Sequence, residues 1–452
     1  PQQSLLLDAV LELRLTHPPA HGQRWNSDST LAASRRGKGK SNAPQADESE
    51  DDDYAGERDL TVSEPTSPKR TAGVRHSNPA QDCRNAIRTG AVRFVRATWL
   101  LEQPEDFVVC RCQDLPADAF LPGPMAEQMY GEQYALVIVS YGWLTPKHPD
   151  PEGFHLRNAR SYLRLHLAQF GLGNSFGVFW DFMSLPQVGP SGRRTSTEQR
   201  TFREGLKSIN FLYGATTTVT LQLTRMPADF VGAPYEDRGW CHFEEVCGVI
   251  IKPTNCLLNL GQAAPALAEG ANWSEVMRQA QVHRPPPTHP DDLARSLQAK
   301  TFTNGTDAQL VVRLYRAFFA QVAGQAQSVA LPHFGVGRGW GEEEAAALGR
   351  ALPAFAVVKQ IQLSRHPLGD TGIAAIAGGL ADLHLLERLD FGGCGFGEPG
   401  LAALTNIVTQ LPDLTTLVLP GTLEETAAGE AISEQLAQRK LFTRTAKVIF
   451  QG

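Results

Sequence analysis

The run Tyr134-Ala135-Leu136-Val137-Ile138-Val139-Ser140 decides the fold, because it is a continuous apolar segment with the length of one β-strand. Strands that are buried on both faces read as such runs rather than as an alternation of apolar and polar residues. Apolar residues then recur at helical spacing, namely Leu156, Ala159, Leu163, Leu167 and Phe170. The segment therefore predicts a buried strand followed by a helix.

The alternation of strand and helix continues to residue 260. In order, the expected elements are a strand at 176–182, a helix marked by Phe202, Leu206, Ile209 and Tyr213, a strand at 216–223, a helix that starts at Trp240, and a strand at 255–260. Strands that alternate with helices form a parallel sheet with right-handed crossovers and helices on both faces. We therefore predict a doubly wound α/β domain over residues 134–260.

The helix that starts at Trp240 carries a carboxylate on its apolar side. At roughly 100° per residue, one arc of about 120° holds Trp240, Phe243, Glu244, Cys247, Ile250 and Ile251. Glu245 falls outside this arc, so we expect Glu244 to face the core and Glu245 to face water. A carboxylate on a buried stripe is costly unless it is paired or functional. Glu244 is thus either a structural residue that caps or pairs with a loop, or a catalytic acid.

Polar and aromatic residues leave the first two strands at their carboxyl ends, where ligands bind in open parallel sheets. Ser140, Tyr141 and Trp143 follow the first strand, and Asp181 follows the second. The helix that carries Trp240 and Glu244 follows the third strand, so all three segments converge on one edge. We therefore expect Ser140, Tyr141, Trp143, Asp181 and Trp240 to bind a ligand, with Tyr141 and Trp143 stacking on a base or nicotinamide ring. Alternatively, Trp180 and Asp181 are core and turn residues.

The C-terminal part of the chain repeats with a period of 28 residues. Three columns share this spacing: Ile361, Leu389 and Leu417; Leu363, Phe391 and Leu419; and Ile376, Leu404 and Ile432. Each unit reads as a short strand, a turn and a helix, and resembles a leucine-rich repeat of the ribonuclease-inhibitor kind. His366 and Cys394 stand where such repeats usually place Asn, and 329–352 is an imperfect earlier unit. Stacked units leave a curved exposed sheet, so we expect residues 327–452 to bind proteins.

Composition divides the remainder of the chain. Residues 1–85 are expected to be a mostly disordered tail, because the polar part carries a basic block at 35–40 and an acidic block at 47–53 and cannot bury enough apolar surface. Residues 86–133, with apolar stretches at 94–95 and 107–110, are expected to lead into the α/β domain through a helix and a short strand. Residues 261–326 are expected to form a helical extension. The chain opens on Pro1 without Met, which is typical of a fragment or a processed form.

Net charge, hydropathy and cysteine spacing limit the kinds of partner and cofactor that we expect for this chain. The formal net charge of −6 over 452 residues gives no reason to expect a nucleic acid. No apolar run approaches the roughly 18 residues of a membrane helix, so no membrane partner is expected. The seven cysteines are scattered and lack the paired spacing of a zinc site or a disulfide framework. We therefore expect reduced thiols, no metal and a cytoplasmic location.

Four segments together resemble the TIR domain family, and most closely a divergent protist-type variant: 134–143, 176–187, 202–223 and 240–246. The shared features are a strand that ends in Ser140-Tyr141, a strand that ends in Asp181 before a loop with Pro186, and the Trp240-Cys241-His242-Phe243-Glu244 helix. Many TIR domains cleave NAD+ at the nicotinamide–ribose bond, and others only associate with one another. The resemblance implies that Glu244 is the catalytic glutamate and that NAD+ is a substrate rather than a tightly bound cofactor.

Three functions stay open at this stage. The first is a TIR-like signalling module with NAD+ hydrolase activity, coupled to a partner-binding repeat region. The second is a non-catalytic adaptor that self-associates through the TIR-like domain while the repeats select a protein partner. The third is a nucleoside-processing transferase, because nucleoside deoxyribosyltransferases have a related α/β layout and also use a Glu. Fold analogy alone does not decide among them.

Overall fold

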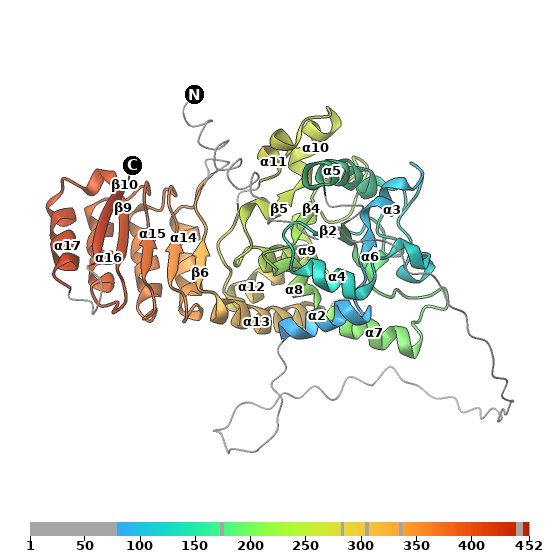
Figure 1. Ribbon diagram of the computed structural model, residues 1–452, viewed down its shortest axis with the longest axis horizontal. Helices are drawn as coiled ribbons and strands as arrows, with labels where there is room; N and C mark the ends of the chain where they lie inside the picture. The colour runs from blue at the N-terminus through green and yellow to red at the C-terminus, as the bar shows by residue number, and fades with distance from the viewer. Residues whose placement is uncertain are drawn as a thin grey trace, which may run out of the picture. The chain divides into compact units, whose positions relative to one another are not determined.

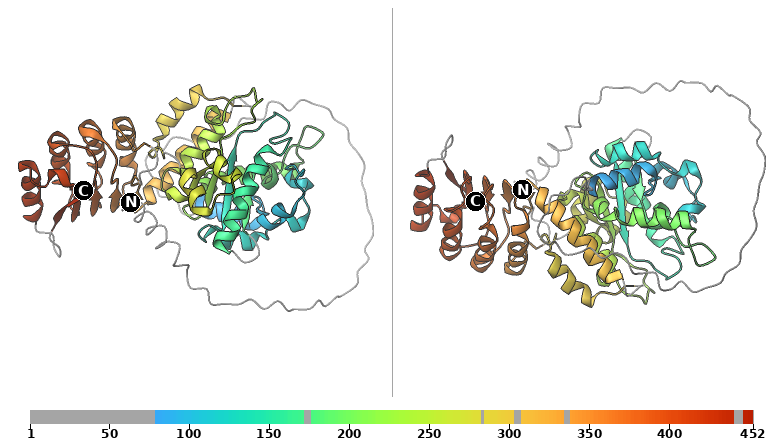
Figure 2. Two further views of the ribbon diagram at one scale, coloured as in Figure 1. Left: turned by 90° about the horizontal axis from the view of Figure 1, so that it is seen from above. Right: turned by 90° about the horizontal axis from the view of Figure 1, so that it is seen from below.

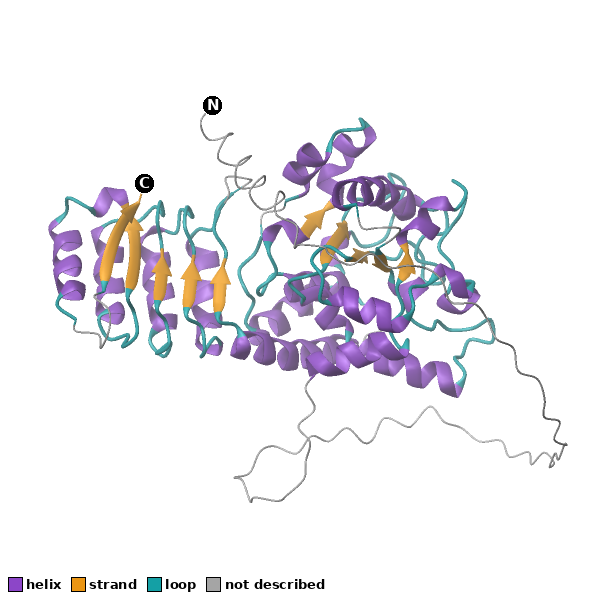
Figure 3. Ribbon diagram, viewed as in Figure 1, coloured by secondary structure: helices purple, strands orange, loops and turns teal. Residues whose placement is uncertain are grey.

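The computed structural model describes residues 79–171, 176–281, 284–302, 307–333, 338–439 and 446–451. Within these ranges the chain is a mixed α/β protein with two five-stranded sheets (Figures 1 and 3). The disordered tail expected at 1–85, with its basic and acidic blocks, falls almost entirely outside the described residues. Helix α2 (Pro79–Thr89) crosses the boundary expected between residues 85 and 86. Among the described residues, no helix has the length and hydropathy needed to cross a bilayer.

The first sheet has the strand order β1-β3-β2-β4-β5. Its strands are β1 (Val95–Arg96), β2 (Leu136–Tyr141), β3 (Gly177–Phe179), β4 (Val219–Leu223) and β5 (Leu257–Asn259). β2, β3, β4 and β5 are parallel, and β1 joins β3 as an antiparallel edge. Every residue of β2 is buried, as its apolar run predicts. The four expected parallel strands are therefore confirmed.

Helices lie on both sides of this sheet (Figure 1). On one side are α5 (Phe154–Phe170), α10 (Leu260–Ala268) and α11 (Trp273–Ala280), which pack against one another. On the other side are α4 (Gly123–Tyr130), α8 (Ile209–Gly214), α9 (Gly239–Gly248) and α13 (Asp307–Gln325). The remaining helices of this part are α3 (Ala97–Glu102), α6 (Asp181–Ser184), α7 (Ser196–Leu206) and α12 (Pro290–Ser296).

Several element boundaries differ from the sequence predictions. The second strand is shorter than 176–182, because the chain turns into helix α6 at Asp181, whose carboxylate accepts the Phe182 N–H at 2.6 Å. The helix expected through residues 202–213 is two helices, α7 and α8. They are separated by a tightened turn in which the Ser208 N–H donates to the Gly205 carbonyl at 2.9 Å. The apolar stretch at 107–110 forms no strand within the described residues.

The second sheet has the order β10-β9-β8-β7-β6, and all its strands are parallel. They are β6 (Ser328–Ala330), β7 (Gln360–Gln362), β8 (Arg388–Asp390), β9 (Thr416–Pro420) and β10 (Lys447–Gln451). Their helices are α14 (Glu342–Ala351), α15 (Gly369–Leu380), α16 (Glu398–Val408) and α17 (Ala427–Ala437), which lie side by side along the sheet (Figure 2).

The period of 28 residues coincides with the register of this second sheet. Ile361 pairs with Leu389, and Leu389 pairs with Leu417. All three side chains are fully buried. The flanking strands β6 and β10 do not share the period, since Val329 pairs with Ile361 and Val448 pairs with Leu417. The sequence therefore predicts the middle of this sheet but misses its last strand.

Candidate active site

The carboxyl end of β2 meets helix α9 and the turn before it through a short chain of hydrogen bonds. The Ser140 hydroxyl donates to Glu244 Oε2 at 2.5 Å. The Tyr235 hydroxyl lies 2.6 Å from the same Ser140 oxygen, and because Ser140 has a single proton, Tyr235 is the donor in that contact. Glu244 thus contacts the sheet. Glu245 instead lies 3.5 Å from His242 Nδ1 on its own helix.

The surroundings of Glu244 favour its neutral form. Its pKa is raised from 4.5 to about 8: removal from water is the largest cause, a hydrogen bond with Ser140 lowers the pKa, the nearby charge of Asp181 raises it, and a hydrogen bond with Tyr213 lowers it. The residue keeps partial contact with solvent, whereas its carboxyl lies among protein atoms. The Tyr213 hydroxyl donates to the Val139 carbonyl at 3.1 Å. Burial outweighs these hydrogen bonds and is the reason that the neutral carboxyl is favoured.

Asp181 holds two aromatic residues that follow β2. Its carboxylate accepts the Tyr141 hydroxyl at 2.5 Å and the Trp143 indole N–H at 3.1 Å. Burial raises the pKa of Asp181, and these hydrogen bonds offset part of the rise. Burial beside Asp181 also raises the pKa of Tyr141 well above its usual value. Asp181 therefore acts as an internal anchor in this structure and positions the Tyr141 and Trp143 rings.

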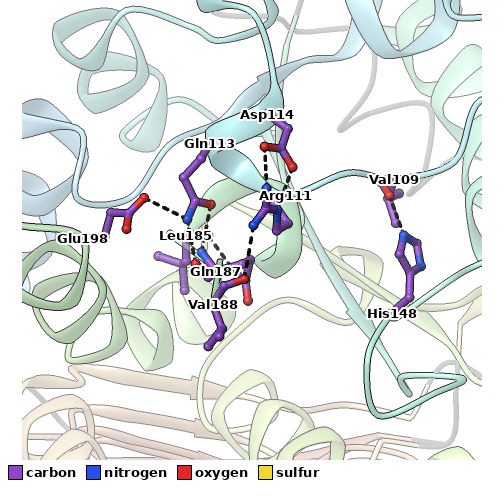
Figure 4. Close-up of polar contacts among 9 residues, drawn as sticks. All are labelled: Val109, Arg111, Gln113, Asp114, His148, Leu185, Gln187, Val188 and Glu198. Atoms are coloured by element: carbon purple, nitrogen blue, oxygen red, sulfur yellow. Dashed lines mark hydrogen bonds and ion pairs between the residues drawn. The ribbon is translucent and has the colours of Figure 1, made fainter. Parts of the chain in front are cut away.

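The loop after Asp181 is fastened to the segment before α4 (Figure 4). The Gln113 side chain accepts the Gln187 N–H at 2.9 Å and donates to the Gln187 carbonyl at 2.6 Å. The Gln113 amide also donates to Glu198 at 3.1 Å. The Gln187 side chain donates to the Asp181 carbonyl at 3.2 Å and to the Leu185 carbonyl at 2.9 Å. Gln113, which lies between β1 and α4, thus helps to fix the loop that follows helix α6.

The structure brings together five of the six residues that the sequence singles out. Ser140 and Glu244 bond directly, and Tyr141 and Trp143 meet at Asp181, whose charge acts on Glu244. Trp240 lies apart from them. Its indole N–H donates to Asp307 on α13 at 2.9 Å, and its ring packs edge-on against Phe243.

Tyr235 and Tyr213 are parts of this cluster that the sequence interpretation does not assign to it. Tyr235 belongs to a short 3₁₀ turn, Tyr235–Asp237, immediately before α9. Helical spacing identifies Tyr213 only as an apolar residue of a helix. No sequence motif distinguishes either residue. From sequence alone, a buried tyrosine is interpreted as a core residue, because the partner of its hydroxyl group is known only from the tertiary structure. Their hydroxyls surround the acid with neutral hydrogen-bonding groups.

Fold and cluster together define a mixed α/β protein with an acidic site at the carboxyl edge of a parallel sheet. In the part of the chain that the structure describes, no group of three or more His, Cys, Asp or Glu residues is arranged to hold a metal ion. No protein-family model matches this chain, and no curated protein matches it. Function is therefore inferred from the chemistry of the site.

Proposed function

We propose that this chain is a TIR-like signalling protein that hydrolyses NAD+ at the nicotinamide–ribose bond, with Glu244 as the catalytic residue. The observation that carries the proposal is the Glu244 carboxyl, which lies at the carboxyl end of β2 with a pKa of about 8 and a hydrogen bond from Ser140. Strongly shifted acids at the carboxyl edge of a parallel sheet are typical of catalytic sites.

The reaction converts NAD+ and water to ADP-ribose, nicotinamide and a proton. The bond from ribose C1′ to the nicotinamide nitrogen breaks, its electron pair leaves with neutral nicotinamide, and water supplies the oxygen that bonds to C1′. Glu244 is protonated in the free protein at neutral pH, and it releases this proton to solvent when a cationic nicotinamide ring beside it lowers its pKa. The resulting carboxylate stabilises the positive charge that develops on the ribosyl carbon.

Trp143 is the aromatic residue best suited to stack on the nicotinamide ring. It keeps partial exposure, and Asp181 holds its indole N–H at 3.1 Å. Tyr141 is 6% exposed and Ser140 is 1% exposed. In the proposed active site, both residues therefore lie below the ligand and do not stack on it. They set the position of Asp181 and Glu244 rather than cover the substrate.

The second sheet supplies the partner-binding region in this proposal. Its neighbouring units are joined by side chains that bond to the backbone of the preceding unit: His366 Nε2 lies 2.8 Å from the Leu331 carbonyl, and Cys394 Sγ lies 3.1 Å from the Leu363 carbonyl. The Asn of a leucine-rich repeat would make contacts of this kind. The seven cysteines are free thiols, which suits a reducing compartment such as the cytoplasm.

The alternative is a non-catalytic adaptor that self-associates and binds proteins through its second sheet. The burial of Tyr141 and Ser140 favours it, because a closed cluster needs no substrate to satisfy its polar groups. The two functions predict different results with the same protein.

The test is release of nicotinamide from NAD+ by the full chain. The hydrolase proposal expects turnover by the wild type, a loss of about 100-fold or more in Glu244→Gln, and near wild-type turnover in the matched control Glu245→Gln. Equal rates in all three proteins would remove Glu244 from the mechanism. Intact NAD+ after long incubation with concentrated wild type, together with self-association in light scattering, would favour the adaptor.

A further inference from the structure

A cavity of about 320 Å³ lies beside the edge strand β1, at the end of the sheet order away from β5. Its walls come from the end of α2, from β1, from a 3₁₀ turn at Ala117–Ala119 and from the start of α4. None of the residues of the candidate active site lines it. A hollow of this size is large enough for a small organic ligand.

Two arginines line this cavity. The Arg93 guanidinium lies 3.2 Å from the centre of the Phe120 ring, and its Nη1 lies 3.9 Å from Cys112 Sγ. Arg96 uses its Nε to donate to the Asp118 carbonyl at 3.1 Å. Across the residues that the structure describes, neither guanidinium is paired with a carboxylate. Most of their N–H groups are therefore available to an anion.

The rest of the wall fits an anion that carries an organic part. Helix α4 begins at Gly123 in the wall and so presents the positive end of its dipole there. A side chain at Gly123 would collide with the Arg88 carbonyl, so glycine is needed for α2 and α4 to approach closely. Asp118 is exposed and also lines the cavity, where its carboxylate can accept from a hydroxyl group.

We propose that this cavity binds a small phosphomonoester. Arg93 and Arg96 hold the phosphate, and Asp118 accepts a hydrogen bond from a hydroxyl of the organic part. Two guanidinium groups offer enough N–H donors to match a dianion with three terminal oxygens better than they match a carboxylate. The stack on Phe120 holds Arg93 in place before the ligand arrives, which lowers the entropy lost on binding. The site does not depend on NAD+ hydrolysis.

Isothermal titration of the full chain with ribose 5-phosphate tests the proposal, with inorganic phosphate and ribose as separate probes. We expect saturable binding of ribose 5-phosphate, weaker binding of inorganic phosphate and none of ribose. Arg96→Gln should weaken the binding of ribose 5-phosphate by about tenfold or more. Arg88→Gln is the matched control, because Arg88 lies outside the cavity and pairs with Glu127 at 3.4 Å on the surface; it should bind as the wild type does.

Two further variants separate a binding defect from a folding defect and from the other site. Arg93→Lys retains the positive charge but loses the planar guanidinium group, so it should also bind ribose 5-phosphate more weakly. Its circular dichroism spectrum should match that of the wild type. Glu244→Gln should bind ribose 5-phosphate normally, which separates this site from the proposed hydrolase. The proposal is overturned if ribose 5-phosphate does not bind, if it binds no more tightly than inorganic phosphate, or if Arg96→Gln and Arg93→Lys bind as the wild type does.

Discussion

Glu244→Gln should be more stable than the wild type at pH 8 and nearly equal to it at pH 5. The pKa of Glu244 is about 8 in the folded chain against an ordinary value of 4.5. Between these values the unfolded chain releases a proton that the folded chain retains, so the stability of the wild type falls as pH rises from 4.5 to 8. A glutamine at this position has no proton to release, and its amide imitates the neutral carboxyl by donating and accepting.

The magnitude follows from the size of the pKa difference. The rise from 4.5 to about 8 spans about 3.5 pKa units, and at about 1.36 kcal/mol per unit it sets a ceiling of about 5 kcal/mol. Because Glu244 keeps partial contact with solvent, we expect about half of this ceiling, about 2–3 kcal/mol at pH 8. At pH 5 the two proteins should differ by less than about 1 kcal/mol.

Urea unfolding of both proteins at pH 5, 6, 7 and 8 measures this difference. The matched control is Glu245→Gln, because Glu245 pairs with His242 on its own helix rather than with the sheet; its stability should follow the wild type across the whole range. Parallel pH profiles for wild type and Glu244→Gln would refute the reasoning, since they would mean that the carboxyl is ionised to the same extent in the folded and unfolded chains.

Two further predictions concern helix packing and the loop that follows helix α6. Gly379→Ala should destabilise the protein by about 2 kcal/mol or more in thermal unfolding, because the added carbon would collide with the Gly349 carbonyl between α14 and α15. The control is the neighbouring Gly378→Ala, whose added carbon meets nothing within 4 Å. This control should instead stabilise the protein by up to about 1 kcal/mol. Gln113→Leu should cost about 1 kcal/mol and speed hydrogen exchange at the Gln187 amide, whose N–H the Gln113 side chain accepts at 2.9 Å. The control Gln128→Leu loses only an exposed contact with Glu132, and unchanged exchange in Gln113→Leu would show that Gln113 does not hold the loop.

Local periodicity accounts for what the sequence predicts correctly. The apolar run through β2 is typical of a strand buried on both faces, and all of its residues are buried. Ile361, Leu389 and Leu417 repeat every 28 residues because each fills the same place in successive units, and the strand register joins them. Helical spacing likewise separates Glu244 from Glu245, since adjacent residues point about 100° apart.

Contacts between distant segments account for what the sequence does not predict. Ser140 and Tyr235 are 95 residues apart and meet only because β2 lies beside β4 in the sheet. Trp240 shares a helix with Glu244, yet its indole bonds to Asp307 on α13, a partner that no local pattern specifies. The antiparallel edge β1 has just two residues, which is too short for any periodicity. Sequence thus determined the faces of the elements, whereas tertiary structure decided which side chains meet, because strand order and loop paths arise from packing across the whole chain.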